Sequence, residues 1–422
     1  MKGNLLIKGA NYINAQKDRI EATDILFTRD PAPRVIIGKN EKRSFKDGTT
    51  VIMADGEYIA PAFCDLRCNV GDISRRGGSP DVSCAVAGGY GIICPTPLAT
   101  SAEYPETPAM YTKYKEKLSA KKEINAIAVS PVVKKHLSAS ICDIEGMAAN
   151  GARVFTDRTS SGYLDNATMQ RIMKSVAQVD GLLICSLHDR RMALDGTVNE
   201  GRIARMTGEK GIPASLELLA VMRSIILSKE TGCRVHISGI SLGYSVKMIA
   251  GAKAEGVKVT CSVSPPYFSY TEDEIIYRGA MAKLMPPLRS ADDMEQIIQG
   301  LSNGVIDCIE SDHMPVSASA KKDLKTGDFG SMSFETTFSA GLTKLVKTGR
   351  ISIFRLIQLM SIRPFEILYG KSFEDSDLAT TGVVKLDLHT GSIYSKQKAL
   401  LAGRVSVFDG AFLYGEVERM GL

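Results

Sequence analysis

The chain has 422 residues, of which 44% are hydrophobic and 23% are charged, and its formal net charge is only +5. These values are typical of a globular protein with a large core, and scattered basic residues with so small a net charge argue against nucleic-acid binding. There is no run of about 18 apolar residues, so we expect no membrane span, and nine cysteines in a chain of this length favour free thiols and a cytoplasmic location.

The beginning of the chain predicts a small β-structure. Residues 4–10, 24–27, 34–37 and 49–53 alternate apolar and polar side chains, the pattern of half-buried strands. Turn-forming residues such as Asp47-Gly48 separate these segments, and no helix-length pattern lies between them. We therefore expect a β-meander here.

From about Tyr58 the pattern changes to short apolar strands that alternate with helical segments, for example Ala214–Lys229 and Gly243–Glu255. About eight such units over roughly 300 residues favour a (β/α)8 barrel over an open sheet. No GxGxxG follows a strand, which argues against a dinucleotide-binding domain. The predicted strands after the first are Gly91–Pro95, Ala126–Ser130, Ala152–Thr156, Leu182–Ser186, Arg234–Ser238, Val257–Cys261 and Ile306–Ser311.

After about Phe373 the pattern returns to strands, and Leu400–Tyr414 predicts two strands around the Asp409-Gly410 turn. The two ends of the chain are therefore expected to form one discontinuous β-sandwich domain, from residues 1–57 and 373–422. The predicted fold class is α/β: a TIM-type barrel of residues 58–372 with this small domain attached.

Several short motifs lie along the barrel segment. Lys283–Arg289 reads K-L-M-P-P-L-R, which is similar to the K-M-N-P-P-L-R of dihydroorotases. On these motifs, which occur in family order, the chain resembles the dihydroorotase and allantoinase branch of the amidohydrolase superfamily. The other matching segments are Asn199–Gly201, Gly211–Pro213, Tyr270–Glu274, Ser311–Pro315, Phe334–Thr336 and Gly403–Val405.

This resemblance implies hydrolysis of a cyclic amide by one or two divalent metals, which activate water at the carboxyl ends of the barrel strands. Asp312 is retained at the family's catalytic position, and Asp157 fits members with a bridging aspartate. A guanidinium at position 67 cannot ligate a cation and repels it. The family's metal positions are Arg67, Asn69, Asp157, Ser186, Gly239 and Asp312, and its substrate positions are Gly71, Leu98, Met285 and Val316.

The first interpretation is a non-catalytic, structural or regulatory relative in pyrimidine biosynthesis that needs no cofactor. Arg67 is then predicted to pair with Asp312 or Asp157, because carboxylates without the metal would otherwise face one another unbalanced. Inactive dihydroorotase-like chains are known as structural partners of aspartate transcarbamoylase, so the resemblance implies this partner, and also a homo-oligomer.

The second interpretation is an active hydrolase with a remodelled zinc site. His188 lies two residues after Ser186, so it faces the barrel mouth if the strand continues, where Asp157 and Asp312 are its expected neighbours. His236 is instead expected in the core or facing a helix, and His313 is expected to make a structural hydrogen bond. Whether the chain is an enzyme is left open by the sequence.

The third interpretation is a binding module in which the barrel mouth takes an anion. Arg75 and Arg76 join Arg67 in adding positive charge to that part of the sequence.

Overall fold

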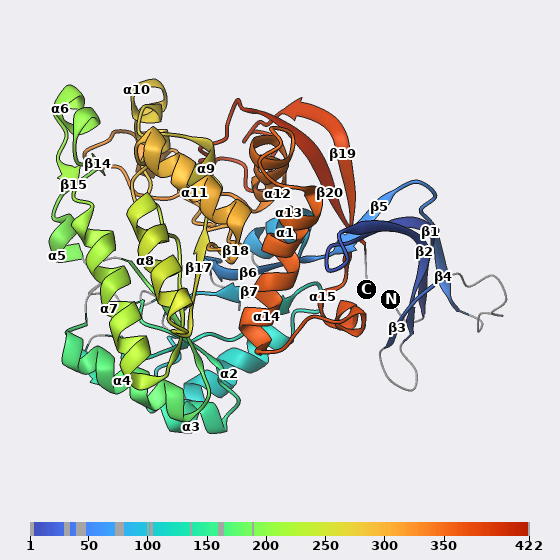
Figure 1. Cartoon of the computed structure of the whole chain (residues 1–422), viewed down its shortest axis with the longest axis horizontal. Helices are drawn as coiled ribbons and strands as arrows, with labels where there is room; N and C mark the ends of the chain where they lie inside the picture. The colour runs from blue at the N-terminus through green and yellow to red at the C-terminus, as the bar shows by residue number, and fades with distance from the viewer. Residues whose placement is uncertain are drawn as a thin grey trace.

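The structure is a computed structural model that contains a barrel of parallel strands and a separate β-sheet beside it (Figure 1). Strands of the barrel fill its centre, helices surround them, and a β-sheet lies at the side where both chain ends are found. The described residues are 4–28, 34–38, 48–71, 80–98, 101, 104–135, 137–158, 164–187 and 190–420.

Strands from both ends of the chain form one seven-stranded sheet, which confirms the predicted β domain. Its order is β20-β19-β5-β1-β2-β3, and β4 pairs with β1. The domain boundaries themselves stay a prediction. The strands are β1 (Leu5–Asn14), β2 (Arg19–Thr28), β3 (Arg34–Ile37), β4 (Thr50–Met53), β5 (Tyr58–Pro61), β19 (Val383–Ile393) and β20 (Phe412–Met420).

The prediction of two strands within Leu400–Tyr414 is wrong, because most of this segment is a loop and only its end belongs to β20. The true hairpin pairs β19 with β20 in antiparallel register. Val405, Val407 and Phe408 of this segment are buried outside any strand. The amide of Val405 donates to the carbonyl of Val316, and its carbonyl accepts from the amide of Met332. The amide of Val407 donates to Ser331 Oγ at 3.0 Å.

The barrel strands form two parallel arcs, of order β6-β7-β8 and β18-β17-β16-β13-β12-β9. The predicted strand 126–130 is split, since β8 pairs with β7 and β9 pairs with β12. The chain that runs from β8 to β9 connects the two arcs on one side. The strands are β6 (Phe63–Cys68), β7 (Tyr90–Pro95), β8 (Asn125–Ala126), β9 (Ser130–Pro131), β12 (Val154–Thr156), β13 (Leu182–Cys185), β16 (Arg234–Ile237), β17 (Val259–Val263) and β18 (Cys308–Ile309).

The other side of the barrel is joined by residues that follow the first and last strands. The amide of Asn69 donates to the carbonyl of His313 at 2.8 Å, and Asp65 accepts from the amide of Ser311 at 3.3 Å. The strand-one end and the strand-eight end are thus held together at the place where the site lies.

Helices cover the outside of the barrel, and their buried residues continue the core of the strands. Side-chain caps start several of them, for example Asp165 before α4 and Ser290 before α11. No helix among the described residues is long and apolar enough to cross a membrane. The main helices are α1 (Pro80–Ala87), α2 (Pro108–Ser119), α3 (Ile144–Ala149), α4 (Asn166–Gln178), α7 (Ser215–Thr231), α8 (Gly243–Ala254), α11 (Ala291–Asn303), α14 (Arg363–Tyr369) and α15 (Leu378–Thr381).

Candidate functional site

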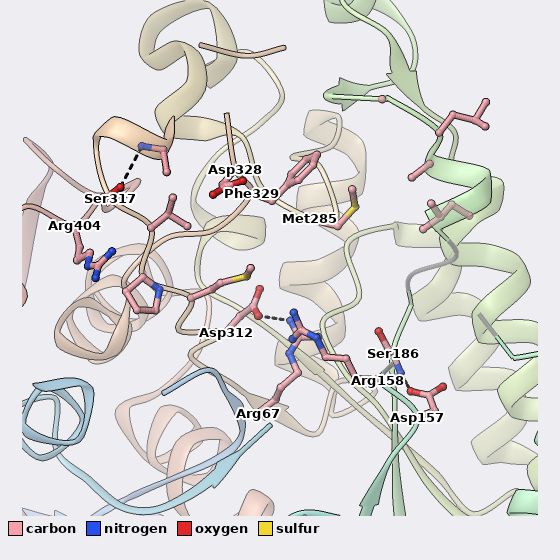
Figure 2. A pocket seen from close by; sticks show the side chains of 18 of the residues that line it. Arg67, Asp157, Arg158, Ser186, Met285, Asp312, Ser317, Asp328, Phe329 and Arg404 are labelled. Carbon is pink, nitrogen blue, oxygen red and sulfur yellow. Dashed lines mark hydrogen bonds and ion pairs between the residues drawn. The ribbon is translucent and has the colours of Figure 1, made fainter. Parts of the chain in front are cut away.

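A cavity of about 620 Å³ opens at the carboxyl ends of the barrel strands (Figure 2). This is the end at which barrel enzymes carry their active sites. Its wall mixes apolar side chains with the arginines Arg67, Arg158, Arg223 and Arg404. The predicted site positions that line it are Arg67, Asp157, Ser186, Met285, Asp312 and Val316.

Arg67 is the buried cation of this site. It lies near the end of β6, and its Nη2 makes a close ion pair with Oδ1 of Asp312. Its Nε lies 3.6 Å from Oε1 of Glu310, and only 5% of the residue is exposed. Burial alone would lower the pKa of Arg67, but the two carboxylates raise it further than burial lowers it. The guanidinium therefore stays charged in the position expected for a cation.

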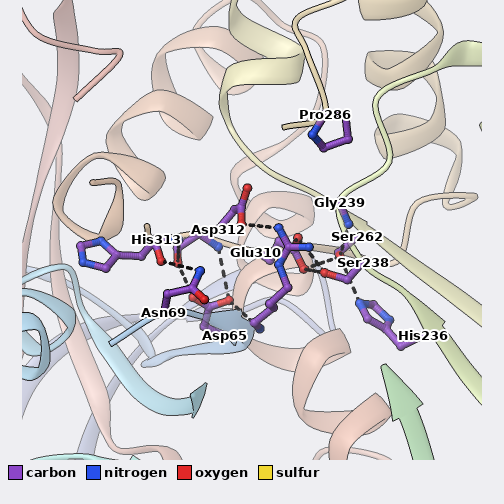
Figure 3. A network of polar contacts seen from close by, with 12 residues as sticks. Asp65, Asn69, His236, Ser238, Gly239, Ser262, Pro286, Glu310, Asp312 and His313 are labelled. Atoms are coloured by element: carbon purple, nitrogen blue, oxygen red, sulfur yellow. Dashed lines mark hydrogen bonds and ion pairs between the residues drawn. The ribbon is translucent and has the colours of Figure 1, made fainter. Parts of the chain in front are cut away.

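Glu310 is the second carboxylate of the site, and the sequence interpretation missed it. Its side chain is buried and accepts hydrogen bonds from Ser238 Oγ, at 2.7 and 2.9 Å, and from Ser262 Oγ at 2.6 Å (Figure 3). Burial raises the pKa of Glu310, while Arg67 opposes that rise. A signal was available in the sequence, because Glu310 stands two residues before Asp312 at the end of a strand.

Asp65 fixes the base of the site. It precedes Arg67 by two residues, on the same face of β6, and its carboxylate accepts from the Ser311 hydroxyl and from the Arg67 amide at 3.2 Å. Burial raises the pKa of Asp65 to about 7, and the hydrogen bonds from Ser311 oppose this rise. Asp65 thus anchors the strand that carries Arg67 to the segment that carries Asp312.

Gly239 leaves the space that the guanidinium occupies. A Cβ atom at this position would lie 3.1 Å from Oε1 of Glu310 and 3.4 Å from Nη1 of Arg67. The φ angle is +76°, which side chains of L-residues rarely adopt. A histidine at position 239 would therefore be strained and would require Glu310 and Arg67 to shift.

Asp157 lies apart from the Arg67 ion pair. Its Oδ1 accepts from the amide of Ser186 at 2.7 Å, as Figure 2 shows. Burial raises the pKa of Asp157 to about 6, and Arg223 opposes this rise. Of the two partners predicted for Arg67, the observed one is Asp312.

Asn69 and His313 make contacts that hold the backbone. Asn69 Nδ2 donates to the His313 carbonyl at 3.3 Å. The His313 ring stacks on Phe334 with centroids 4.1 Å apart, and its Nδ1 accepts from the amide of Ser333 at 3.1 Å. Burial lowers the pKa of His313 and Asp81 opposes this, so the ring has a structural role, as predicted.

His236 is a core residue, also as expected. Its Nδ1 lies 3.0 Å from Thr260 Oγ1 and its Nε2 lies 3.0 Å from Ser262 Oγ. Burial, together with Lys253 and Arg67, lowers the pKa of His236 to about 3. The neutral ring thus supports the serine that binds Glu310.

The remaining predicted positions are not gathered at the cavity. The Gly71 amide donates to Asp81 Oδ2 at 2.9 Å, and Leu98 is half-buried outside the cavity wall. His188, Arg75 and Arg76 lie outside the described residues. Within the described ranges, no three His, Cys, Asp or Glu side chains are grouped as a metal would require.

The best-matched motif residues form a second polar network, away from Arg67. Arg289 Nη1 donates to Asn199 Oδ1 at 2.6 Å, and its Nε donates to Ser241 Oγ at 3.0 Å. Its Nη2 lies 3.6 Å from Glu217, and Asn199 Nδ2 donates to Glu272 at 2.6 Å. Segments far apart in the sequence are thus joined by the residues that carry the resemblance.

Sequence relatives decide the family. A dihydroorotase of Caldicellulosiruptor saccharolyticus is 30% identical, over 98% of this chain and 96% of its own length. The chain belongs to the dihydroorotase family. A dihydroorotase of Staphylococcus epidermidis is 29% identical over 86% of both chains, and the family model described as dihydro-orotase-like matches residues 79–244.

Solved structures show the same fold. The L-hydantoinase (dihydropyrimidinase) from Arthrobacter aurescens superposes with a TM-score of 0.83 over 98% of this chain and 93% of that one, at 22% identity. The dihydropyrimidinase from Brevibacillus agri gives a TM-score of 0.78 over 98% and 92% of the two chains, at 18% identity. These similarities confirm the predicted barrel with an attached β domain.

Proposed function

We propose that this dihydroorotase-family chain is non-catalytic and has a structural or regulatory role in pyrimidine biosynthesis. The observation that carries the proposal is the buried ion pair of Arg67 with Asp312 and Glu310. A guanidinium has no lone pair to give a metal, and it neutralises the carboxylate that a metal would use. The donor set of the described residues therefore does not fit zinc, and we derive no hydrolytic step.

The geometry around the ion pair supports the same proposal. Gly239 gives no side chain to the site, and Arg67 fills the space in front of it. Asp157 is bound to the Ser186 amide, and the retained Asp312 is bound to Arg67. A proton shuttle must be free to exchange its proton with the reacting water, which an ion-paired carboxylate does poorly.

The first test is an assay of dihydroorotate hydrolysis and carbamoyl aspartate cyclisation, with and without added zinc. We expect rates equal to a protein-free blank in both directions, and less than one zinc per chain after dialysis. The dihydroorotase of Caldicellulosiruptor saccharolyticus, assayed alongside, is the positive control. Turnover that Asp312→Ala abolishes, together with stoichiometric metal, would overturn the proposal in favour of a remodelled site with Asp157, His188 and Asp312.

We further propose that the chain forms a homo-oligomer and binds aspartate transcarbamoylase, the role implied by its resemblance to inactive relatives. Sedimentation of the chain alone and mixed with the aspartate transcarbamoylase of the same organism tests both parts. We expect a self-associated species and a heavier mixed complex. Independent sedimentation of the two proteins at micromolar concentration would contradict the partnership.

A small-molecule role at the barrel mouth is supported by the cavity, which keeps Arg158, Arg223 and Arg404 in its wall beside Arg67. Thermal stabilisation by dihydroorotate or carbamoyl aspartate without turnover would assign the non-catalytic chain a regulatory function. No stabilisation by either compound would leave the structural function alone.

A further inference from the structure

A second cavity lies at the opposite end of the barrel, and nothing in the proposed function uses it. This lower cleft has a volume of about 610 Å³. It is lined by Val86 and Gly91, by residues 118–119 and 121–126, by Ala379, Thr380 and Gly382, and by Arg419. Its lining includes the beginnings of β7 and β8 and part of α15, three elements that are labelled in Figure 1. It is therefore separate from the cavity at the barrel mouth.

Arg419 is the main feature of the lower cleft. It projects from β20, and its Nη1 donates to the carbonyl of Tyr90 at the start of β7. Its Nε is buried and has no hydrogen-bond partner among the described residues. Burial alone lowers the pKa of Arg419 to about 10, and no carboxylate contributes. No carboxylate therefore balances the charge of Arg419, which lines the cleft and can attract an anion there.

The backbone is shaped to admit this guanidinium. Gly382 has a φ of +73°, and a Cβ atom there would lie only 2.6 Å from Nη2 of Arg419. Gly91, also in the wall, approaches the carbonyl of Thr381 so closely that a Cβ would lie 1.9 Å from that oxygen. Gly382 thus lets the backbone approach the arginine, and Gly91 lets β7 approach the segment that carries Gly382.

The charge of the lower cleft selects an anion. Lys121 and Lys122 line the wall with Arg419, and the single acidic residue in the lining is Glu123. Cations thus exceed carboxylates by two, and neither lysine has an ion-pair partner within the described part of the chain. An organic phosphate carries about −1.5 to −2 charges at neutral pH and offers three acceptor oxygens, which matches this excess.

The rest of the wall is apolar. Leu118, Ile124 and Ala126 are buried, and Val86 and Ala379 complete the apolar surface. We propose that the lower cleft binds a small organic phosphate, whose phosphate group lies against Arg419, Lys121 and Lys122 and whose body lies on this apolar wall. The site is independent of the barrel mouth and of the proposed function.

The test uses the full chain and measures its melting temperature, and then its binding by calorimetry, with inorganic phosphate and with phenyl phosphate. Sodium chloride at equal ionic strength is the reference. We expect both phosphates to stabilise the chain saturably beyond chloride. We expect phenyl phosphate to bind about tenfold more tightly, because its ring buries apolar surface. Equal stabilisation by chloride would overturn the site, and equal affinity for the two phosphates would overturn the apolar part of the proposal.

Variants locate the binding. Arg419→Gln should weaken phenyl phosphate binding at least tenfold, and the double change Lys121→Gln with Lys122→Gln should weaken it about threefold to tenfold. The matched control is Lys174→Gln with Lys247→Gln, two exposed lysines on α4 and α8, which should leave the affinity unchanged. If Arg419→Gln fails to fold, the lysine pair decides. Unchanged binding in the Lys121 and Lys122 variant would place the anion elsewhere and refute the site.

Discussion

Arg289 and Arg67 are both buried in the barrel, but they lie in segments that differ in their similarity to dihydroorotases. Arg289 belongs to the motif segment most similar to dihydroorotases, and it joins Asn199, Ser241 and Glu217. Arg67 stands where the family resemblance places a metal ligand, and it joins Asp312 and Glu310. Both guanidiniums are buried beside carboxylates, yet only Arg289 lies in a segment that matches the motifs of the family.

This comparison indicates that the motif residues around Arg289 stabilise the fold and do not by themselves indicate activity. Glu217 accepts hydrogen bonds from the amides of Ser241 and Leu242 at 2.9 and 3.0 Å and from Ser245 Oγ at 2.7 Å, so the Arg289 network ties helix α7 to α8. Such a network preserves fold whether or not the barrel mouth performs chemistry. Family membership and activity must therefore be judged at different residues.

The largest expected effect is the loss of Arg289. Arg289→Met leaves Glu217 as a fully buried charge without its countercharge, so we expect the free energy of unfolding to fall by about 3–5 kcal/mol. Denaturant unfolding followed by circular dichroism measures this change. The control is Arg350→Met, which breaks an exposed pair with Glu295 and should cost at most about 1 kcal/mol. Equal losses of unfolding free energy in the two variants would show that the Arg289 network stabilises the chain no more than an exposed ion pair does.

A smaller loss is expected at Arg67. Arg67→Met should cost about 2 kcal/mol, because the Asp312 side chain is 21% exposed at the cavity and can be solvated there. Loss of Arg289 should cost more, because it also leaves Asn199 and Ser241 without their donor. Adding Asp312→Asn to Arg67→Met should restore part of the loss, since one unbalanced carboxylate is removed. The same unfolding experiment gives both values. A single variant as stable as the original chain would show that the ion pair does not stabilise this site.

The third effect is a change in the pH dependence of stability, which is small for each single pH unit. The pKa of Asp65 is raised from 3.8 to about 7 by burial, so the folded chain holds this proton while the unfolded chain has released it. The stability from this proton is complete below pH 3.8 and is lost as the pH rises through 7. Asp65→Asn should therefore remove a downward slope of up to about 1.4 kcal/mol per pH unit between these limits. Parallel stability curves for the two chains between pH 4 and 7 would contradict this assignment.

Much of the fold followed from the sequence, because strand alternation and helix spacing depend on neighbouring residues. The strands β3 and β7 and the helices α7 and α8 lie within a few residues of their predicted positions. The segment before β20 was predicted wrongly, since the burial of Val405 and Val407 against a distant part of the chain imitates a strand pattern. A local pattern shows that a residue is buried and leaves open which partner buries it.

The site was predictable only in part, for the same reason. Charge balance predicted a carboxylate partner for Arg67, and Asp312 is that partner. Glu310 was missed because its importance depends on Ser238 and Ser262, which two other strands bring beside it. The sequence alone does not indicate that these serines lie close together. The parallel register of β16 and β17 places Ser238 beside Ser262.

The glycine at position 239 also limits the routes by which this site can change. A side chain there would meet the carboxylate of Glu310 and the guanidinium of Arg67, and the φ of +76° would strain it, so a histidine at 239 requires Arg67 to move. A change at position 67 alone would leave the carboxylates of Asp312 and Glu310 without their cation. Positions 67 and 239 are therefore coupled, and a metal-binding barrel mouth would require both to change together.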